Sequence, residues 1–140
     1  MSRMTDGPTG TRTSRQLTGD AAESLVADRL AARGWRILAR NLHAGRSEFD
    51  IVAVDPGPPA RLVIVEVRYR RWRDFGLPEE TFDYRKRTQL RLGIARLIDA
   101  GVLPDGSDLP HLPIAVDLAV VEPEPGSSPS IRLYPNALMD

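Results

Sequence analysis

Two short apolar stretches of the sequence carry carboxylates, which are costly to bury. Glu48 and Asp50 stand two residues apart in the first stretch, and Glu66 lies in the second. In an extended chain, residues two apart project from one face, so Phe49 and Ile51 are expected to project from the other. An ionised carboxylate without a partner costs several kcal/mol in such surroundings. The pattern therefore predicts a cation between Asp50 and Glu66.

Spacing alone leaves the nature of that cation open. Arg68 stands two residues after Glu66, on the same predicted face, so it or another arginine would form a structural ion-pair network. A divalent metal ion would use the carboxylates of Asp50 and Glu66 as ligands. The chain has no cysteine, so any metal must be held by oxygen or imidazole, which favours a hard cation. His43 and His111 are far apart in the sequence and have no third partner, which argues against a zinc site.

Two further features would bring polar groups to these acids. Lys86 is the only lysine in the chain, and it stands on the predicted sheet-facing side of a helix, where it reaches the acids or covers apolar surface. Gln89, one turn along, can contact a substrate. An arginine-aromatic run after Arg68 suits phosphate contacts and base stacking, although such runs are also typical of a solvated strand end. The residues expected to bind nucleic acid there are Arg70, Arg71, Trp72 and Arg73.

The elements that must position these residues follow from apolar periodicity and capping residues. They predict an α/β fold in the order α-β-β-β-α-β-β, with a central mixed β-sheet flanked by helices and a helical crossover. Asp83 can cap the second helix and Gly101 can end it. The predicted buried stripe of that helix contains Leu90, Ile94, Leu97 and Ile98. The predicted helices span 18–33 and 83–100, and the strands span 35–41, 48–55, 62–69, 114–121 and 130–134.

Length and composition fit one domain, because 140 residues suffice for one α/β core. We expect a flexible N-terminal tail over residues 1–17 and a single domain over 18–140. No apolar run approaches the roughly 20 residues of a membrane-spanning helix, and the polar start lacks a secretory signal. We therefore expect no membrane partner and a cytoplasmic location. The formal net charge is zero, so nucleic-acid affinity would need a local basic patch.

The order and spacing of these pieces resemble a known family. Asp50, followed after a hairpin by Glu66-Val67-Arg68, resembles the PD-(D/E)XK nuclease signature, with arginine where that signature usually has lysine. From Gly19 onward the pattern is similar to the YraN-like family of small bacterial proteins. Ser47 and Ala115 stand where that family often has glycine and arginine. The matching pieces are Gly19, Glu23, Arg40-Asn41, Glu48-Phe49-Asp50-Ile51-Val52, Val65-Glu66-Val67-Arg68-Tyr69-Arg70, Phe75-Gly76, Lys86 and Val116-Asp117.

The resemblance implies a restriction-endonuclease-like fold related to Holliday-junction resolvases. It implies Mg2+ or Mn2+ as cofactor, held by Asp50, Glu66 and Glu23 of the first helix. Glu23 can instead form a capping box with Asp20 at the start of that helix. Glu48 is expected to support the ligands from outside the coordination sphere, or to be a solvated acid at the start of its strand.

Arg68 separates two classes of function. Arginine stays protonated, so Arg68 can hold a phosphate but cannot be a general base, and Lys86 is the candidate replacement. The leading hypothesis is a metal-dependent nuclease-like protein that binds and hydrolyses DNA, at branched or single-stranded sites in repair or recombination. The alternative is a non-catalytic nucleic-acid-binding or scaffolding module with the same fold. Resolvase-like relatives act as homodimers, so the resemblance also allows a homodimer.

Overall fold

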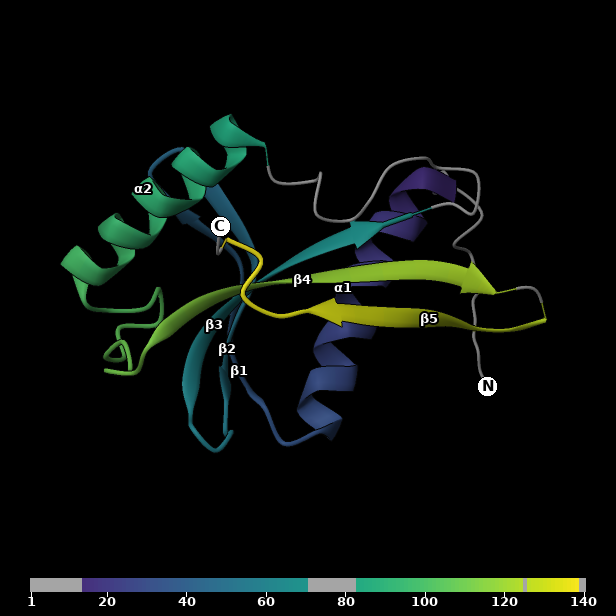
Figure 1. The fold of residues 1–140 in the computed structure, drawn as a ribbon, viewed down its shortest axis with the longest axis horizontal. Coiled ribbons are helices and arrows are strands. Elements are labelled where there is room, and N and C mark those ends of the chain that lie inside the picture. The colour runs from purple at the N-terminus through teal and green to yellow at the C-terminus, as the bar shows by residue number, and fades with distance from the viewer. Residues whose placement is uncertain (1–13, 71–82, 125, 139–140) are drawn as a thin grey trace.

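The computed structural model describes residues 14–70, 83–124 and 126–138, which form two helices and five strands (Figure 1). The helices are α1 (Ser14–Ala32) and α2 (Tyr84–Ala100). The strands are β1 (Arg36–Ala44), β2 (Ser47–Asp55), β3 (Arg61–Tyr69), β4 (Ile114–Glu124) and β5 (Ser127–Tyr134).

The strands form one sheet in the order β1-β2-β3-β4-β5. All neighbouring pairs are antiparallel except β3 and β4, which run parallel. A parallel pair needs a crossover connection, and α2 lies in the connection between β3 and β4. The predicted mixed sheet is therefore confirmed, and the chain belongs to the α/β class.

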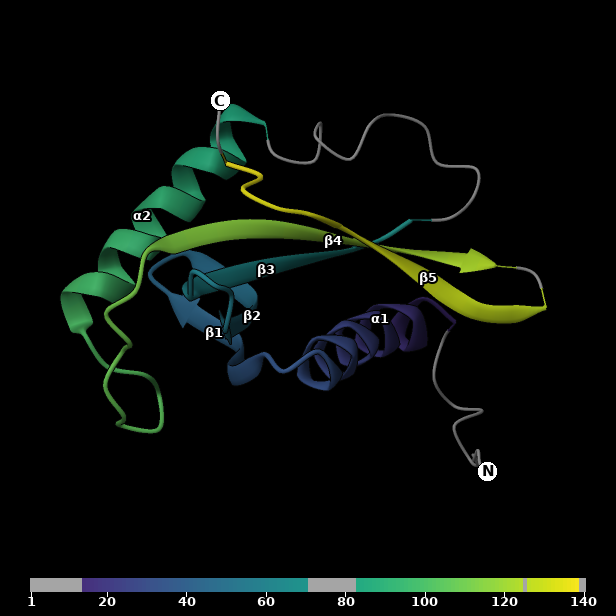
Figure 2. The same ribbon diagram turned by 60° about the horizontal axis from the view of Figure 1, so that its bottom comes forward.

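The two helices cover opposite faces of this sheet, as Figure 2 shows from a second direction. Each face has its own apolar core, because side chains alternate between the faces along a strand. Neither helix of the described ranges has the length and apolar character needed to cross a membrane. The buried residues on the α1 side are Ala22, Val26, Ala27, Leu30, Ile51, Ala53, Val63, Val65, Ala119 and Val121. Those on the α2 side include Leu42, Phe49, Val52, Leu62, Ile64, Leu90, Leu97, Val116, Leu118 and Val120.

Capping residues set both ends of α2 as predicted. The Asp83 side chain accepts a hydrogen bond from the backbone N–H of Lys86 at 2.9 Å. Gly101 ends the helix at a φ of 70°, in the left-handed region that favours glycine. The predicted buried stripe is wrong at Ile98, which is exposed, because the helix rests on the sheet through a different line of residues. The buried residues of α2 are Leu90, Gly93 and Leu97.

Helix α1 begins earlier than its apolar periodicity predicts. It starts at Ser14 rather than at residue 18, so residues 14–17 of the predicted tail are helical. Residues 1–13 lie outside the described residues. Asp20 is therefore inside the helix, and the capping box with Glu23 is wrong, because a capping box requires its first residue at the helix start.

Strand β2 loses its regular alternation at Asp50. Phe49 packs on the α2 side of the sheet and Ile51 on the α1 side, so the prediction that they share a face is wrong. The ladder between β2 and β3 ends at the pair Ile51 and Val65. Beyond that pair β2 stays paired with β1, and Asn41, which lies between the β1 partners of Ile51 and Phe49, has a φ of 52°, so the regular pleat is interrupted and β2 turns at Asp50. That turn lies at the candidate site.

Candidate metal centre

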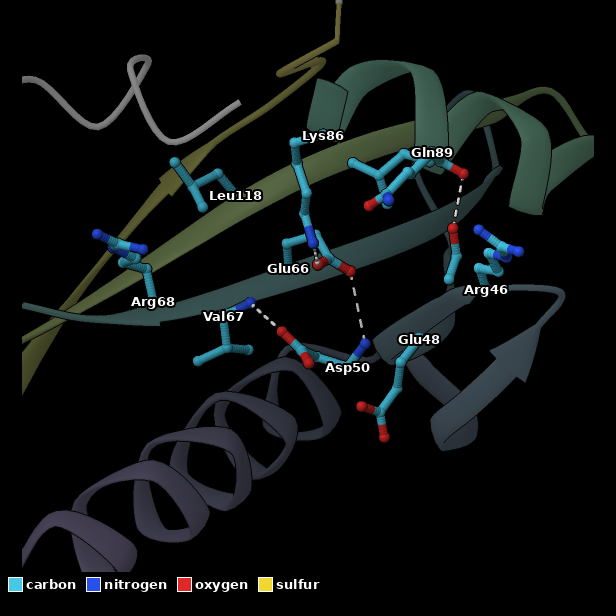
Figure 3. A pocket seen from close by; sticks show the side chains of 11 residues that line it. Arg46, Glu48, Asp50, Glu66, Val67, Arg68, Lys86, Gln89 and Leu118 are labelled. Atoms are coloured by element: carbon cyan, nitrogen blue, oxygen red, sulfur yellow. Dashed lines mark hydrogen bonds and ion pairs between the residues drawn. The ribbon is translucent and has the colours of Figure 1, made fainter. Parts of the chain in front are cut away.

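The acids Asp50 and Glu66 lie where strands β2 and β3 separate. Past the last ladder pair, the Oδ2 atom of Asp50 accepts a hydrogen bond from the backbone N–H of Val67 at 2.8 Å. The Oε2 atom of Glu66 accepts one from the backbone N–H of Asp50 at 3.5 Å (Figure 3). Each carboxylate thus takes over a bond that the ladder would have made, and the opposite strand fixes its position.

Burial makes these carboxylates reluctant to ionise. Glu66 is 6% exposed, and desolvation followed by the charge of Asp50 raises its pKa to about 7, against the lowering effect of Lys86. The pKa of Asp50 is also raised, mainly by desolvation, although the hydrogen bond from Val67 opposes the shift. Two desolvated acids that repel each other form a site that a cation would stabilise.

Among the described residues, the cation in contact with Glu66 is Lys86 rather than an arginine. Its Nζ atom lies 3.3 Å from the Oε1 atom of Glu66. Lys86 comes from the first turn of α2, and Figure 3 shows its side chain pointing from the helix toward Glu66. Of the two predicted positions for this lysine, the one that reaches the acids is the one observed.

One cavity of about 390 Å³ brings most of the predicted site residues together. Arg68 and Glu48 are exposed at its edge. The Oε2 atom of Glu48 lies 3.6 Å from the imidazole Nε2 atom of His43. The predicted residues that line the cavity are Glu48, Asp50, Glu66, Arg68, Lys86 and Gln89.

Arg46, which was not among the predicted site residues, also lines this cavity. Arg46 is exposed and follows Gly45, whose φ of 63° marks the tight turn between β1 and β2. The signal that could have identified Arg46 is its place as a basic residue in a hairpin turn, two residues before Glu48.

Other predicted residues lie away from the cavity or outside the described ranges. Glu23 does not line the cavity, and Arg40 lies 3.7 Å from its Oε1 atom. Burial and the charge of Asp50 raise the pKa of Glu23, so the negative charges of Glu23 and Asp50 repel each other. The backbone N–H of Arg70 donates to Val121 at 2.8 Å. The predicted nucleic-acid contacts Arg71, Trp72 and Arg73 lie outside the described residues.

Comparison with known proteins identifies the family. The model of the "Uncharacterised protein family UPF0102" matches residues 22–121. This chain belongs to the UPF0102 family. A UPF0102 protein of Symbiobacterium thermophilum is 39% identical over 119 residues, which cover 85% of this chain and 93% of that protein. One of Trichlorobacter lovleyi is 34% identical over 122 residues, which cover 87% and 90%. The predicted YraN-like membership is confirmed.

A solved structure also aligns with this UPF0102 chain at low similarity. It is Pyrococcus furiosus SfsA in complex with Ca2+, at 14% identity and a TM-score of 0.38. The alignment covers 86% of this chain and 63% of that one, so the UPF0102 chain spans less than two thirds of SfsA.

The donor set of the UPF0102 site fits a hard divalent cation. One oxygen of each carboxylate accepts a hydrogen bond from a backbone N–H. The oxygens left for a metal ion are Oδ1 of Asp50 and Oε1 of Glu66, and the latter lies beside Lys86. Mg2+ is typically bound through one or two carboxylates together with water and substrate phosphates. Within the described ranges, no three acidic or histidine side chains lie close enough to hold a metal together. The residues present therefore fit a two-carboxylate site, not the predicted set of three with Glu23.

The raised pKa of Glu66 predicts a pH-dependent stability. The folded protein holds this proton up to about pH 7, whereas the unfolded chain releases it near the ordinary value of 4.5, so stability falls as pH rises between these values. Glu66→Gln removes the charge and is expected to raise the free energy of unfolding by up to about 3 kcal/mol at pH 8. Near pH 4 the two proteins should be equally stable. Urea unfolding at both pH values measures this.

Glu124→Gln is the control for that experiment. Glu124 is an exposed glutamate of β4, so its replacement is expected to change stability by less than about 0.5 kcal/mol at either pH. A Glu66→Gln variant that is less stable than wild type at pH 8 would show that the ion pair with Lys86 outweighs the burial of the charge.

Proposed function

We propose that this UPF0102 protein has a PD-(D/E)XK-type fold and is a metal-dependent nuclease that hydrolyses DNA phosphodiesters. The single observation that carries the proposal is the meeting of Asp50, Glu66 and Lys86 in one cavity. The two acids lie on the second and third strands, and the lysine comes from the helix of the crossover. This placement agrees with the resemblance that the sequence shows to the PD-(D/E)XK signature.

In this proposal each side chain has a separate chemical role. Asp50 and Glu66 would hold Mg2+ or Mn2+, and the bound ion would polarise the phosphodiester and activate water. Lys86 carries an amine that can give up a proton in a buried site, which a guanidinium cannot do. Lys86 would therefore move the proton at the attacking water, and Arg68 would hold a phosphate oxygen.

Two arginines would bind the nucleic-acid backbone on either side of the acids. Arg46 and Arg68 both line the cavity and are exposed, and neither has an ion-pair partner in the part of the chain that the structure describes. An unpaired guanidinium suits bidentate contact with phosphate. Because the chain has zero formal net charge, such a local pair is what would attract DNA. A homodimer would present two such sites to the two strands of a duplex.

The proposal is tested with purified protein and a panel of linear, flap, fork and four-way DNA substrates. We expect cleavage of at least one substrate with Mg2+ or Mn2+ and none in the presence of a chelator, because the chelator removes the ion that would activate the water. A panel that stays uncut with both metals would contradict the nuclease.

The identity of residue 68 favours a second candidate, a non-catalytic nucleic-acid-binding or scaffolding module. An arginine at this cavity is a permanent cation that can hold a phosphate without turnover. Salt-sensitive DNA binding without cleavage would support the module. Arg68→Lys separates the two candidates, since a gain of cleavage would reveal a nuclease impaired by its arginine.

A further inference from the structure

Helix α2 approaches strand β2 closely at Gly93. A Cβ atom at this position would lie 2.8 Å from the Cβ of Ser47 and 2.9 Å from the Cζ of Phe49. Real Cβ atoms essentially never come closer than 3.0 Å to such neighbours. Glycine is a poor helix former, so its place in the middle of a helix has a packing reason. Only glycine lets the helix lie this deep on the strand.

A hydrogen bond fixes the same place from the strand. The hydroxyl Oγ of Ser47 donates to the backbone carbonyl of Gln89 at 2.6 Å. Ser47 is buried, at 8% exposure. Steric contact at Gly93 and the hydrogen bond at Gln89 act on two successive turns of α2, so together they fix both the depth and the rotation of the helix.

We propose that Ser47 and Gly93 are positioning residues that set α2 at the depth where Lys86 reaches Glu66. Lys86 stands seven residues before Gly93, which is nearly two whole turns, so the two face the sheet from the same side of the helix. A shift of the helix away from β2 at Gly93 moves Lys86 away from Glu66. The inference rests on the proposed function, in which Lys86 transfers the proton.

The test uses the fact that Lys86 is the only lysine of the chain. A water-soluble carbodiimide adds to a carboxylic acid to give an O-acylisourea. A neighbouring amine then attacks its acyl carbon to form an amide, and the reagent leaves as the urea, which carries the elements of water. The 3.3 Å contact between Lys86 Nζ and Glu66 Oε1 should therefore give an internal cross-link. Peptide mapping by mass spectrometry identifies it, and neither metal nor DNA is needed.

Gly93→Ala is the decisive variant. We expect it to lose most of the Lys86–Glu66 cross-link, although alanine is the better helix former. Gly19→Ala is the matched control, because a Cβ at Gly19 of α1 meets nothing within 4 Å. It should keep the full yield.

A merely structural role would not give this pattern. Circular dichroism of each variant establishes that it is folded before the yields are compared. If Gly93→Ala does not fold, Ser47→Ala carries the test, since it removes only the hydroxyl and should lower the yield. A folded Gly93→Ala with wild-type yield would overturn the inference, as would unchanged yield in Ser47→Ala. Because the cross-link forms without metal or DNA, these results stand apart from any failure to cleave.

Discussion

Asp50→Asn is expected to slow metal-dependent DNA cleavage by about 10³-fold, because it removes a charged ligand of the ion that activates water. The amide oxygen of asparagine can still accept the hydrogen bond that the Val67 N–H gives to Asp50. Burial disfavours the charge of Asp50, so the variant should fold at least as stably as wild type. Single-turnover cleavage of the best substrate, together with thermal unfolding, measures both expectations.

The control for this result is Asp99→Asn on the exposed end of α2. It makes the same chemical change at a position outside the cavity and should leave the cleavage rate unchanged. An Asp50→Asn variant that cleaves at the wild-type rate would exclude Asp50 as a metal ligand. Loss of cleavage with loss of folding would show that Asp50 serves the fold.

Lys86→Ala is expected to slow cleavage by roughly 10²- to 10⁴-fold, the usual contribution of a general acid or base. The ammonium lies 3.3 Å from Glu66 in the wild-type protein. Lys86→Arg keeps a positive charge but cannot transfer the proton, so it should be nearly as slow as Lys86→Ala. Comparison of the two rates separates proton transfer from simple charge.

Metal affinity provides the second readout for Lys86. The ion and the ammonium compete for the same carboxylate of Glu66, so Lys86→Ala should bind Mn2+ at least as tightly as wild type. A Lys86→Arg protein that cleaves at the wild-type rate would show that the site needs only the charge. Loss of metal binding in Lys86→Ala would show that Lys86 organises the acids.

Sequence patterns were informative where structure is local. The runs around Asp50 and Glu66 are rich in β-branched and apolar residues, so their strands and the position of their acids could be predicted. Asp83 and Gly101 marked the ends of α2 because a cap is made within a few residues. For the same reason the pair of acids could be predicted as a site from the sequence.

Features that depend on tertiary contacts could not be read from periodicity. Phe49 and Ile51 lie on opposite faces at the place where the β2–β3 ladder ends and where Asn41 of the paired strand β1 has a φ of 52°. Such irregularities depend on how neighbouring strands pair. The contact of Lys86 with Glu66 depends on how deeply α2 packs at Gly93, which no helical pattern reveals. Helix α1 begins at Ser14, a start that apolar periodicity did not indicate, so Asp20 lies inside the helix and cannot form the capping box.

The central claim is that Asp50 and Glu66 together bind a divalent cation, and calorimetric titration with Mn2+ and Mg2+ tests it most directly. We expect saturable binding to the wild-type protein and affinity at least roughly tenfold weaker in Asp50→Asn. The Gly19→Ala protein should bind as wild type does. Absence of binding to the wild type, or equal affinity in Asp50→Asn, would contradict the claim.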